Sequence, residues 1–229
     1  MKKISLDGRL ASAAKLVRQG ARFADIGTDH AHLPIFLLQN ETVKYAVCSD
    51  INDGPLKSAR ENALAAGVFE KIDFALADGA AALSDKDVTD IAICGMGGEL
   101  IADIIENAPF LKKNGIRLIL QPMSRISVLR KMLAMLGFAI NTEEYSESAG
   151  KLYVTISADY DGIQREISEY EAEFGNEKFL ADISGAKRKF LLKKATALLR
   201  AANGKAEGGE EASKESLLYT YINNILTEN

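Results

Sequence analysis

The sequence predicts an α/β fold in which a mostly parallel sheet is followed by a small helical domain. Between residues 22 and 136, short apolar runs of strand type alternate with amphipathic runs of helix type, the pattern of parallel strands joined by helical crossovers. Two further strand-like runs, 138–145 and 151–158, flank a short polar turn and predict an antiparallel terminal hairpin. After Tyr160 only helical periodicity remains.

Each expected element of the sheet domain follows from local pattern. The expected helices have apolar residues three and four positions apart. Gly20 and Gly67 come after the last such residue of their helices, and Pro34 and Pro55 fall in first turns, where a missing N–H costs little. Strands are expected at 22–26, 44–49, 72–77, 90–94 and 116–120, and helices at 6–19, 31–39, 54–67, 99–107 and 127–136.

The chain is expected to divide into a sheet domain, residues 1–159, and a helical domain of coiled-coil type, residues 160–229. Three apolar stripes at helix spacing support the second domain, and a loop rich in Gly and Glu separates the last two. The stripes are Ile163, Ile167 and Tyr170; Phe179, Ile183, Ala186, Phe190 and Ala197; and Leu217, Leu218, Tyr221, Ile222 and Ile225.

Composition excludes several classes of protein. The 229 residues are 47% apolar and 26% charged, as in ordinary globular proteins, and no apolar run is long enough to span a membrane. The charged start lacks a signal-peptide pattern, and two cysteines suggest no disulfide framework, so we expect a cytoplasmic protein. His30 and His32 have no partner at zinc spacing, so no metal is expected. Nothing indicates an obligate protein partner.

The first strand is followed by a turn that is expected to contact a ligand, because ligands of open parallel sheets bind beyond the carboxyl ends of the strands. Gly27 lets the backbone approach such a ligand, and Thr28, Asp29 and His30 follow it. The glycines of a dinucleotide fingerprint are missing, which disfavours an NAD-dependent dehydrogenase. Taken alone, the turn could equally be an ordinary strand-to-helix connection.

The next two strands end in carboxylates. Asp50 can accept hydrogen bonds from both hydroxyls of a ribose, and a purely capping role is less favoured because Asn52 could cap the following helix. Asp78, before Gly79, can accept from an adenine amino group, although Asp-Gly turns are common. Gly27, Asp50 and Asp78 at successive strand ends outline the amino-acid end, ribose and adenine of an adenosyl ligand.

A glycine cluster follows the fourth strand at residues 95–98. It lacks the lysine and the spacing of a phosphate-binding loop, and it leaves bare backbone where a flat substrate ring could approach. Met96, within the cluster, could form a wall of that pocket or simply fill a gap in the core.

Together these segments resemble the bacterial TrmK family, the tRNA (adenine-22-N(1))-methyltransferases, over essentially the whole chain. The resemblance implies a Rossmann-like class I methyltransferase domain, S-adenosylmethionine as methyl donor and the D-arm of tRNA as substrate. His32 stands where the family pattern has Tyr, and Met123 where it has Asn. The segments that carry the resemblance are 24–31 with Leu33-Pro34, 50–56, 77–79, 93–98 and 118–122.

The resemblance also implies a set of site residues. Ring nitrogen 1 of adenine has its own lone pair, so catalysis can rest on positioning and on tolerating positive charge. We expect Asp78 and Asp29 to stabilise that charge, and Gln121 and Arg9 to contact the substrate. The donor-binding positions would be Gly27, Thr28, Asp29, His30, Asp50, Ile51, Asn52, Asp78, Gly79, Gly95, Met96 and Gly97.

The charge pattern suggests where tRNA would bind. The net charge is −4, yet residues 187–205 contain no acid. A run of positive charges usually forms a helix face exposed to solvent. The resemblance favours the alternative that this run binds tRNA as a clamp. Two alternatives stay open: a methyltransferase acting on a small molecule or protein, and a non-catalytic RNA-binding module. The candidate RNA contacts are Arg9, Lys187, Arg188, Lys189, Lys193, Lys194 and Arg200.

Overall fold

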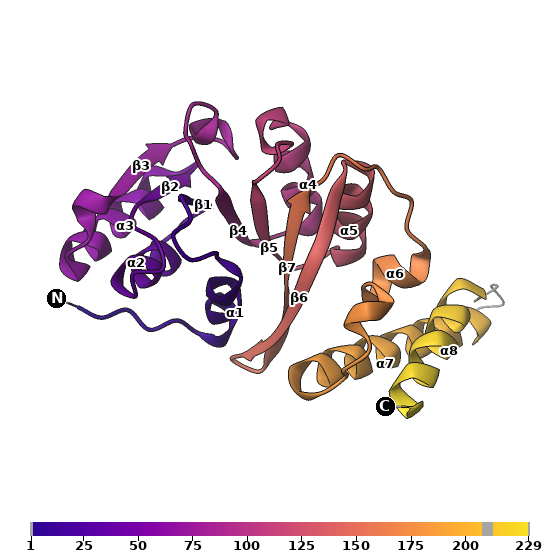
Figure 1. Cartoon of the computed structure of the whole chain (residues 1–229). Helices are drawn as coiled ribbons and strands as arrows, with labels where there is room; N and C mark the ends of the chain where they lie inside the picture. The colour runs from indigo at the N-terminus through magenta and orange to yellow at the C-terminus, as the bar shows by residue number, and fades with distance from the viewer. Residues whose placement is uncertain (1, 208–212, 229) are drawn as a thin grey trace.

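A computed structural model describes residues 2–207 and 213–228, and its centre is one seven-stranded sheet (Figure 1). The strands are β1 (Phe23–Ile26), β2 (Ala46–Asp50), β3 (Ile72–Leu76), β4 (Asp90–Met96), β5 (Arg117–Pro122), β6 (Phe138–Ser148) and β7 (Lys151–Tyr160). Their order is β3-β2-β1-β4-β5-β7-β6. The first five strands pair in parallel, and β7 is antiparallel to both of its neighbours. The predicted Rossmann-like α/β fold is confirmed.

Helices cover both faces of the sheet. Alternate residues of β4 show why: Ile91 and Ile93 pack in one apolar cluster with α4 and α5, whereas Ala92 packs in another with α1, α2 and α3. These parallel strands are therefore buried on both sides and read as continuous apolar runs. The helices are α1 (Gly8–Leu16), α2 (His32–Gln39), α3 (Asp53–Ala66), α4 (Gly98–Glu106) and α5 (Ile126–Met135); short 3-10 turns are η1 (Phe69–Lys71), η2 (Ala81–Leu83) and η3 (Pro109–Leu111).

Both strands of the terminal hairpin are longer than predicted: β6 extends to Ser148 and β7 to Tyr160, so only two residues separate them. Ala149 and Gly150 make the turn, both with positive φ, which is the backbone of a tight two-residue hairpin. Since β7 is antiparallel to both β5 and β6, the latter two run in the same direction. The hairpin tip therefore projects from the edge of the sheet at which the parallel strands end.

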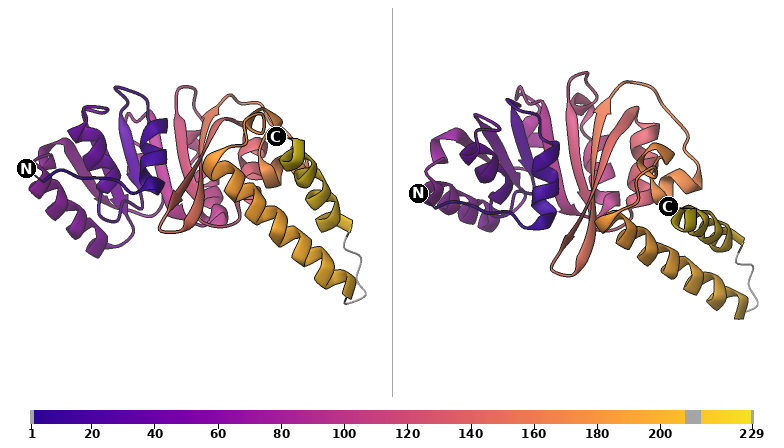
Figure 2. Two further views of the ribbon diagram at one scale, coloured as in Figure 1. Left: turned by 90° about the horizontal axis from the view of Figure 1, so that it is seen from below. Right: turned by 60° about the horizontal axis from the view of Figure 1, so that its bottom comes forward.

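The helices after β7 are α6 (Glu169–Phe174), α7 (Gly185–Glu207) and α8 (Ser213–Glu228), with the turn η4 (Glu177–Phe179) between the first two. They share an apolar cluster of their own, and the α7–α8 pair extends away from the sheet (Figure 2). The prediction of helices in this segment is confirmed, but their coiled-coil nature is not.

Three details of the predicted helical stripes are wrong. Ile163 and Ile167 precede α6 and lie in irregular chain. Ala197 and Leu217 are exposed rather than buried in the α7–α8 seam. The buried face of α7 also contains Leu191, which the predicted stripe left out, while Phe190 of that stripe packs both against this cluster and on Tyr145 of β6. The sequence of the hairpin alone does not reveal this contact with the sheet.

Candidate functional site

A cavity of about 670 Å³ opens where β1, β2 and β4 end. Gly97 was expected to line it but does not; it precedes α4 as the N-cap residue, facing Ser124. The structure brings the other predicted donor-binding residues together around this one cavity. These residues are Gly27, Thr28, Asp29, His30, Asp50, Ile51, Asn52, Asp78, Gly79, Gly95 and Met96.

Gly27 forms bare backbone beside Met96. Its φ is 71°, and a Cβ added there would lie 2.2 Å from the Met96 methyl carbon. The amides of Gly27 and Thr28 both donate to the carbonyl oxygen of Ser49, at 2.8 and 3.0 Å, which fixes the turn against β2. The positive φ favours glycine here, and a side chain would in addition displace the Met96 methyl group from the cavity wall.

Asp50 fixes two of the loops that surround the cavity. Its Oδ1 accepts a hydrogen bond from the Asn52 amide at 2.9 Å, and its Oδ2 accepts one from the Asp29 amide at 3.4 Å. Each carboxylate oxygen can accept a second hydrogen bond. Asp50 is almost buried yet lines the cavity, so it retains acceptor capacity for a ligand with hydroxyl groups.

Asp78 and Gly79 lie in the loop that follows β3 rather than in the strand itself, which ends at Leu76. Asp78 is exposed. Gly79 has a φ of 51°, and a Cβ there would approach Ile104 of α4 to 3.3 Å. The loop and α4 therefore close this end of the cavity tightly, leaving a narrow apolar space beside an exposed carboxylate.

Asp25 is a cavity residue that sequence reasoning missed. Burial raises the pKa of its carboxyl group to about 7. Two neighbours oppose this rise: the Thr28 hydroxyl, which donates a hydrogen bond to the carboxylate at 2.7 Å, and the charge of Arg9. The charge of Asp50 raises it further. The sequence did contain a signal for Asp25, an acid inside an otherwise apolar strand. Burying a carboxyl group is costly, so its presence there suggests a functional role.

Gln121 does not contact a substrate as predicted, because its side chain is fully buried. Its Nε2 donates to the carbonyl oxygen of Arg9 and to the hydroxyl of Thr155, both at 2.9 Å, and its Oε1 accepts from the Arg9 guanidinium at 2.9 Å. Arg9 itself lines the cavity, and its Nη1 lies 3.6 Å from where a Gly95 Cβ would be. Gln121 thus positions Arg9.

The two departures from the family pattern both line the cavity. Met123 is about half exposed, and its amide donates to the carbonyl oxygen of Met96 at 2.8 Å. His32 stacks on His30 with ring centroids 5.6 Å apart, and burial together with the His30 charge lowers the pKa of His32, which favours its neutral form. Further lining residues missed by sequence reasoning are Leu10, Ile26, Leu33, Ala77, Cys94, Leu100 and Ile104.

Three of the candidate RNA contacts instead bind the protein itself. Lys187 donates to main-chain carbonyls in and after η4, at 2.6 and 2.7 Å. Arg188 donates to the carbonyl oxygen of Leu226 at 3.1 Å. Lys194 is mostly covered and pairs with Glu173 at 2.6 Å, and burial lowers its pKa. These side chains hold the helical segment together, which corrects their assignment as free RNA ligands.

Of the candidate RNA contacts on α7, Lys189, Lys193 and Arg200 are exposed, and Lys189 lies at the hairpin tip. A Cβ on Gly8, beside Arg9, would lie 2.5 Å from the carbonyl oxygen of Glu147 at the hairpin tip, and the Glu147 carboxylate pairs with Lys189 at 2.6 Å. Across the described ranges, no hydrogen bond or ion pair engages the side chain of Lys193 or Arg200. Contacts therefore connect the cavity, the hairpin tip and the basic helix along one edge of the sheet.

In the part of the chain that the structure describes, no three side chains of His, Cys, Asp or Glu are placed to hold a metal ion. Over residues 2–207 and 213–228, none of the helices is both long and apolar enough to cross a membrane.

Comparison with known proteins identifies relatives of the whole chain. Residues 6–156 match a family model described as a methyltransferase domain. A tRNA (adenine(22)-N(1))-methyltransferase of Bacillus subtilis is 34% identical over 170 residues, 71% of each chain.

Solved structures extend this likeness to the helical segment. A Streptococcus pneumoniae protein, described as a candidate tRNA (m1A22) methyltransferase and crystallised with S-adenosyl-L-methionine, superposes with a TM-score of 0.84. It is 34% identical, and the match covers 97% of this chain and 100% of that one. TrmK of M. capricolum, in complex with S-adenosyl-homocysteine, has a TM-score of 0.77 at 27% identity, covering 97% of both chains.

Proposed function

The chain belongs to the TrmK family of tRNA (adenine-22-N(1))-methyltransferases, and we propose that it methylates ring nitrogen 1 of adenine 22 in the D-arm of tRNA. The observation that supports this most is the continuity of the cavity, the hairpin tip and the basic face of α7 along one edge of the sheet. A small-molecule methyltransferase would need the cavity but not the adjoining basic helix.

The cavity residues fit S-adenosylmethionine, which supplies the methyl group when it is bound. A Cβ at Gly27 would fill the space beside Met96, so the bare backbone leaves room for the amino-acid end of the donor. Asp50 retains acceptor capacity for the ribose hydroxyls, and Asp78 with Gly79 lies where the adenine ring would fit. The cavity volume, about 670 Å³, falls within the usual range for small-molecule and cofactor sites.

The chain's own contribution to the reaction is positioning and electrostatics. Adenine nitrogen 1 attacks with its own lone pair, so no side chain has to remove a proton first. Positive charge moves onto the ring during transfer, and the carboxylates of Asp29 and Asp78 at the cavity stabilise it. That nitrogen is occupied by pairing in a duplex, so the base has to be unpaired and extruded to reach the cavity.

Arg9 and Met123 form the substrate side of the site. Gln121 holds the Arg9 guanidinium at the cavity wall, where it can bind a phosphate or the rim of the base. Met123 projects into the mouth as an apolar surface where the family pattern has an amide. We infer that this protein holds the target base by contact with its face rather than by an asparagine hydrogen bond.

Residues 160–229 serve as the tRNA clamp, and residues 1–159 as the catalytic domain. The basic contacts reduce to Lys189, Lys193 and Arg200 on the outer side of α7, because the other cations bind within the protein. Phosphate contacts from such side chains give affinity without sequence preference. The substrate places the enzyme in the cytoplasm.

The test is methylation of bulk unmodified tRNA with labelled donor, followed by nucleoside analysis. We expect label in 1-methyladenosine, none in a transcript whose adenine 22 is replaced by guanine, and less label with the Asp50→Ala variant when the donor is limiting. Label in a small molecule or protein instead would favour the alternative methyltransferase. A folded protein that fails to bind the donor would favour a non-catalytic RNA-binding module.

A further inference from the structure

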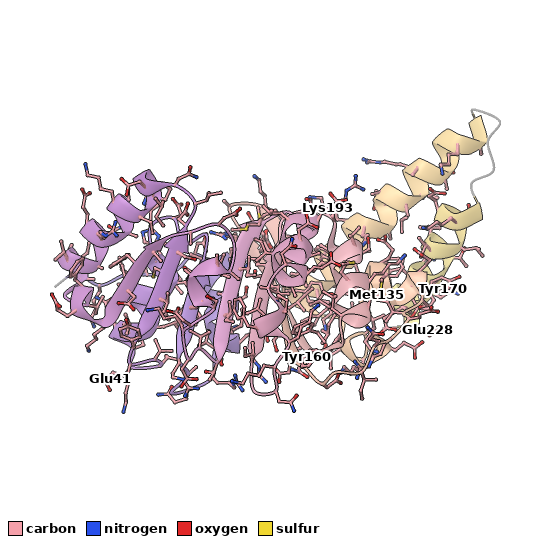
Figure 3. All side chains as sticks on the ribbon, turned by 90° about the horizontal axis from the view of Figure 1, so that it is seen from above. Glu41, Met135, Tyr160, Tyr170, Lys193 and Glu228 are labelled. Carbon is pink, nitrogen blue, oxygen red and sulfur yellow. The ribbon has the colours of Figure 1, made fainter. Side chains whose placement is uncertain are left out.

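The outer face of α7 combines cations with exposed leucines. Seven residues share this broad face, each of them three or four positions from another member, and all of them are exposed. They are Lys189, Leu192, Lys193, Thr196, Leu199, Arg200 and Asn203. In Figure 3 Lys193 lies on the side of α7 away from α8, whose end is marked by Glu228.

Leu192 and Leu199 are not part of the apolar core of the helical segment. Their exposed fractions are 46% and 37%, whereas Leu191, Ala195 and Ala202, on the adjoining side of the helix, are buried. Single exposed leucines are ordinary. Here the two lie two helical turns apart, roughly 10 Å, on the same face as the exposed cations. The helix therefore has a second amphipathic face that the described chain does not cover.

The chemistry of this face selects its ligand. A phosphate backbone accounts for the cations but not for the leucines, because base faces are covered by stacking inside a duplex. Unpaired nucleotides present apolar base faces between phosphates, and proteins bind them with stacking side chains, most often aromatic, beside basic grooves. Aliphatic side chains can also cover the face of an extruded base. The face has no acid, and Lys189 at its start touches the hairpin tip beside the cavity, so it continues the proposed substrate path.

We propose that the outer face of α7 binds unpaired nucleotides of tRNA, with Leu192 and Leu199 against base faces and Lys193 and Arg200 against phosphates. This rests on the proposed function, since it names the part of the tRNA that the clamp holds. Lys189 is paired with Glu147 in an exposed, screened contact that a phosphate can replace. A stem bound through its phosphates alone would leave the two leucines in water.

The two contributions separate in a binding experiment. The variants are Leu192→Ala with Leu199→Ala, Lys193→Gln with Arg200→Gln, and Leu217→Ala as a matched control, since Leu217 is a 59% exposed leucine on α8. Alanine favours helix, so none of the leucine variants should disturb folding, which thermal unfolding checks. Dissociation constants are measured for whole tRNA, a single-stranded oligonucleotide and a duplex of equal length over a range of salt concentrations.

We expect the leucine variant to bind tRNA and the single-stranded oligonucleotide roughly tenfold more weakly than the parent protein does. The salt dependence of its binding and its affinity for the duplex should not change. The cation variant should weaken all three and lower the slope by about one unit per lost contact. The control should match the parent protein.

Parent-like tRNA and single-strand binding by the leucine variant would overturn the proposal. Equal losses on duplex and single strand would overturn it as well. If the cation variant alone weakens binding, the clamp stands and the leucine contact fails. If neither variant changes tRNA binding, the clamp itself fails. Binding of an acidic peptide at the leucine face in place of RNA would assign the face to a protein partner.

Discussion

At the scale of single residues, Asp50 is the side chain on which donor binding should depend most. Replacing Asp50 with Ala removes acceptors for the ribose hydroxyls and also frees the Asn52 amide that it now accepts from. We expect donor affinity to fall by about 1–3 kcal/mol, the cost of losing such buried hydrogen bonds. Calorimetric titration measures this, with Asp53→Ala, an exposed acid three positions away, as the control. Unchanged affinity in a folded variant would exclude Asp50 from the site.

Asp25 gives the site a pH dependence. The folded-state pKa of its carboxyl group is raised by burial to about 7, so the free protein keeps this group protonated at pH 6 and ionised at pH 8. A cationic donor in the same cavity favours the ionised form. Donor affinity should therefore rise as the pH increases through 7, by up to roughly tenfold.

Titration calorimetry at pH 6, 7 and 8 checks the dependence, with Asp25→Asn as the comparison. The same raised pKa means that the folded state binds more protons than the unfolded chain between about pH 4 and 7. Asp25 therefore costs stability increasingly as the pH rises through that window, and Asp25→Asn should flatten the stability profile. An equal pH dependence in the Asn variant would assign the effect to another group.

Residue-scale prediction succeeded where a role follows from a strand end and failed where it depends on a neighbour distant in sequence. Asp50 and Asp78 lie at the cavity because the carboxyl ends of parallel strands share one edge. Gln121 was misassigned because its partner Arg9 is 112 residues away, and nothing local shows that the amide is buried. Asp25 was missed because it lies within a strand whose other residues form the core.

At the scale of elements, a buried ion pair joins α5, β6 and α6. Arg130 and Glu143 are 1% and 0% exposed and pair at 2.7 Å. Arg130 also donates to the carbonyl oxygen of Ala172, and the Tyr145 hydroxyl donates to Glu143 at 2.8 Å. Burial and the Glu143 charge raise the pKa of Tyr145, which keeps that hydroxyl a donor. The network docks the start of the helical segment on the sheet.

Arg130→Met alone should lower the free energy of unfolding by about 3–5 kcal/mol, because Glu143 stays buried without its partner. Arg130→Met together with Glu143→Leu should recover most of that loss, since apolar residues of similar volume replace both charges. Denaturant unfolding of the two single variants and the double variant measures the coupling. Additive losses in the double variant would mean that the two charges are not one unit.

Prediction of elements was limited by the same dependence on distant partners. The strands and first helices were found because their apolar periodicity is local. All the cations from Lys187 to Arg200 were candidate RNA contacts, yet Lys194 turns inward to Glu173, which lies on α6. The predicted stripe of α7 left out Leu191, which is buried, and included Ala197, which is exposed. Neither outcome follows from the helix's own spacing.

At the scale of the whole molecule, we propose that the fold separates the methyl-transfer site from the surface that binds tRNA. The cavity lies among the ends of β1, β2 and β4, while α7 extends from the hairpin tip at the same edge (Figure 1). In Figure 3 Glu41, before β2, lies at the lower left of the sheet, whereas Lys193 lies on the upper edge where α7 begins to extend to the right. A tRNA bound along α7 can therefore direct one extruded base into the cavity without contacting the far side of the sheet.

The measurement that tests this separation most directly is steady-state methylation of tRNA by a variant with Lys189, Lys193 and Arg200 all replaced by Glu. The account predicts that the tRNA concentration for half-maximal rate rises strongly and the salt slope of tRNA binding becomes shallower, by roughly one unit per lost contact. The rate at saturating tRNA and the donor affinity should change little, because the cavity is untouched. A triple variant with the parent's tRNA affinity and salt slope would contradict the account, since α7 would then be only a solvated face.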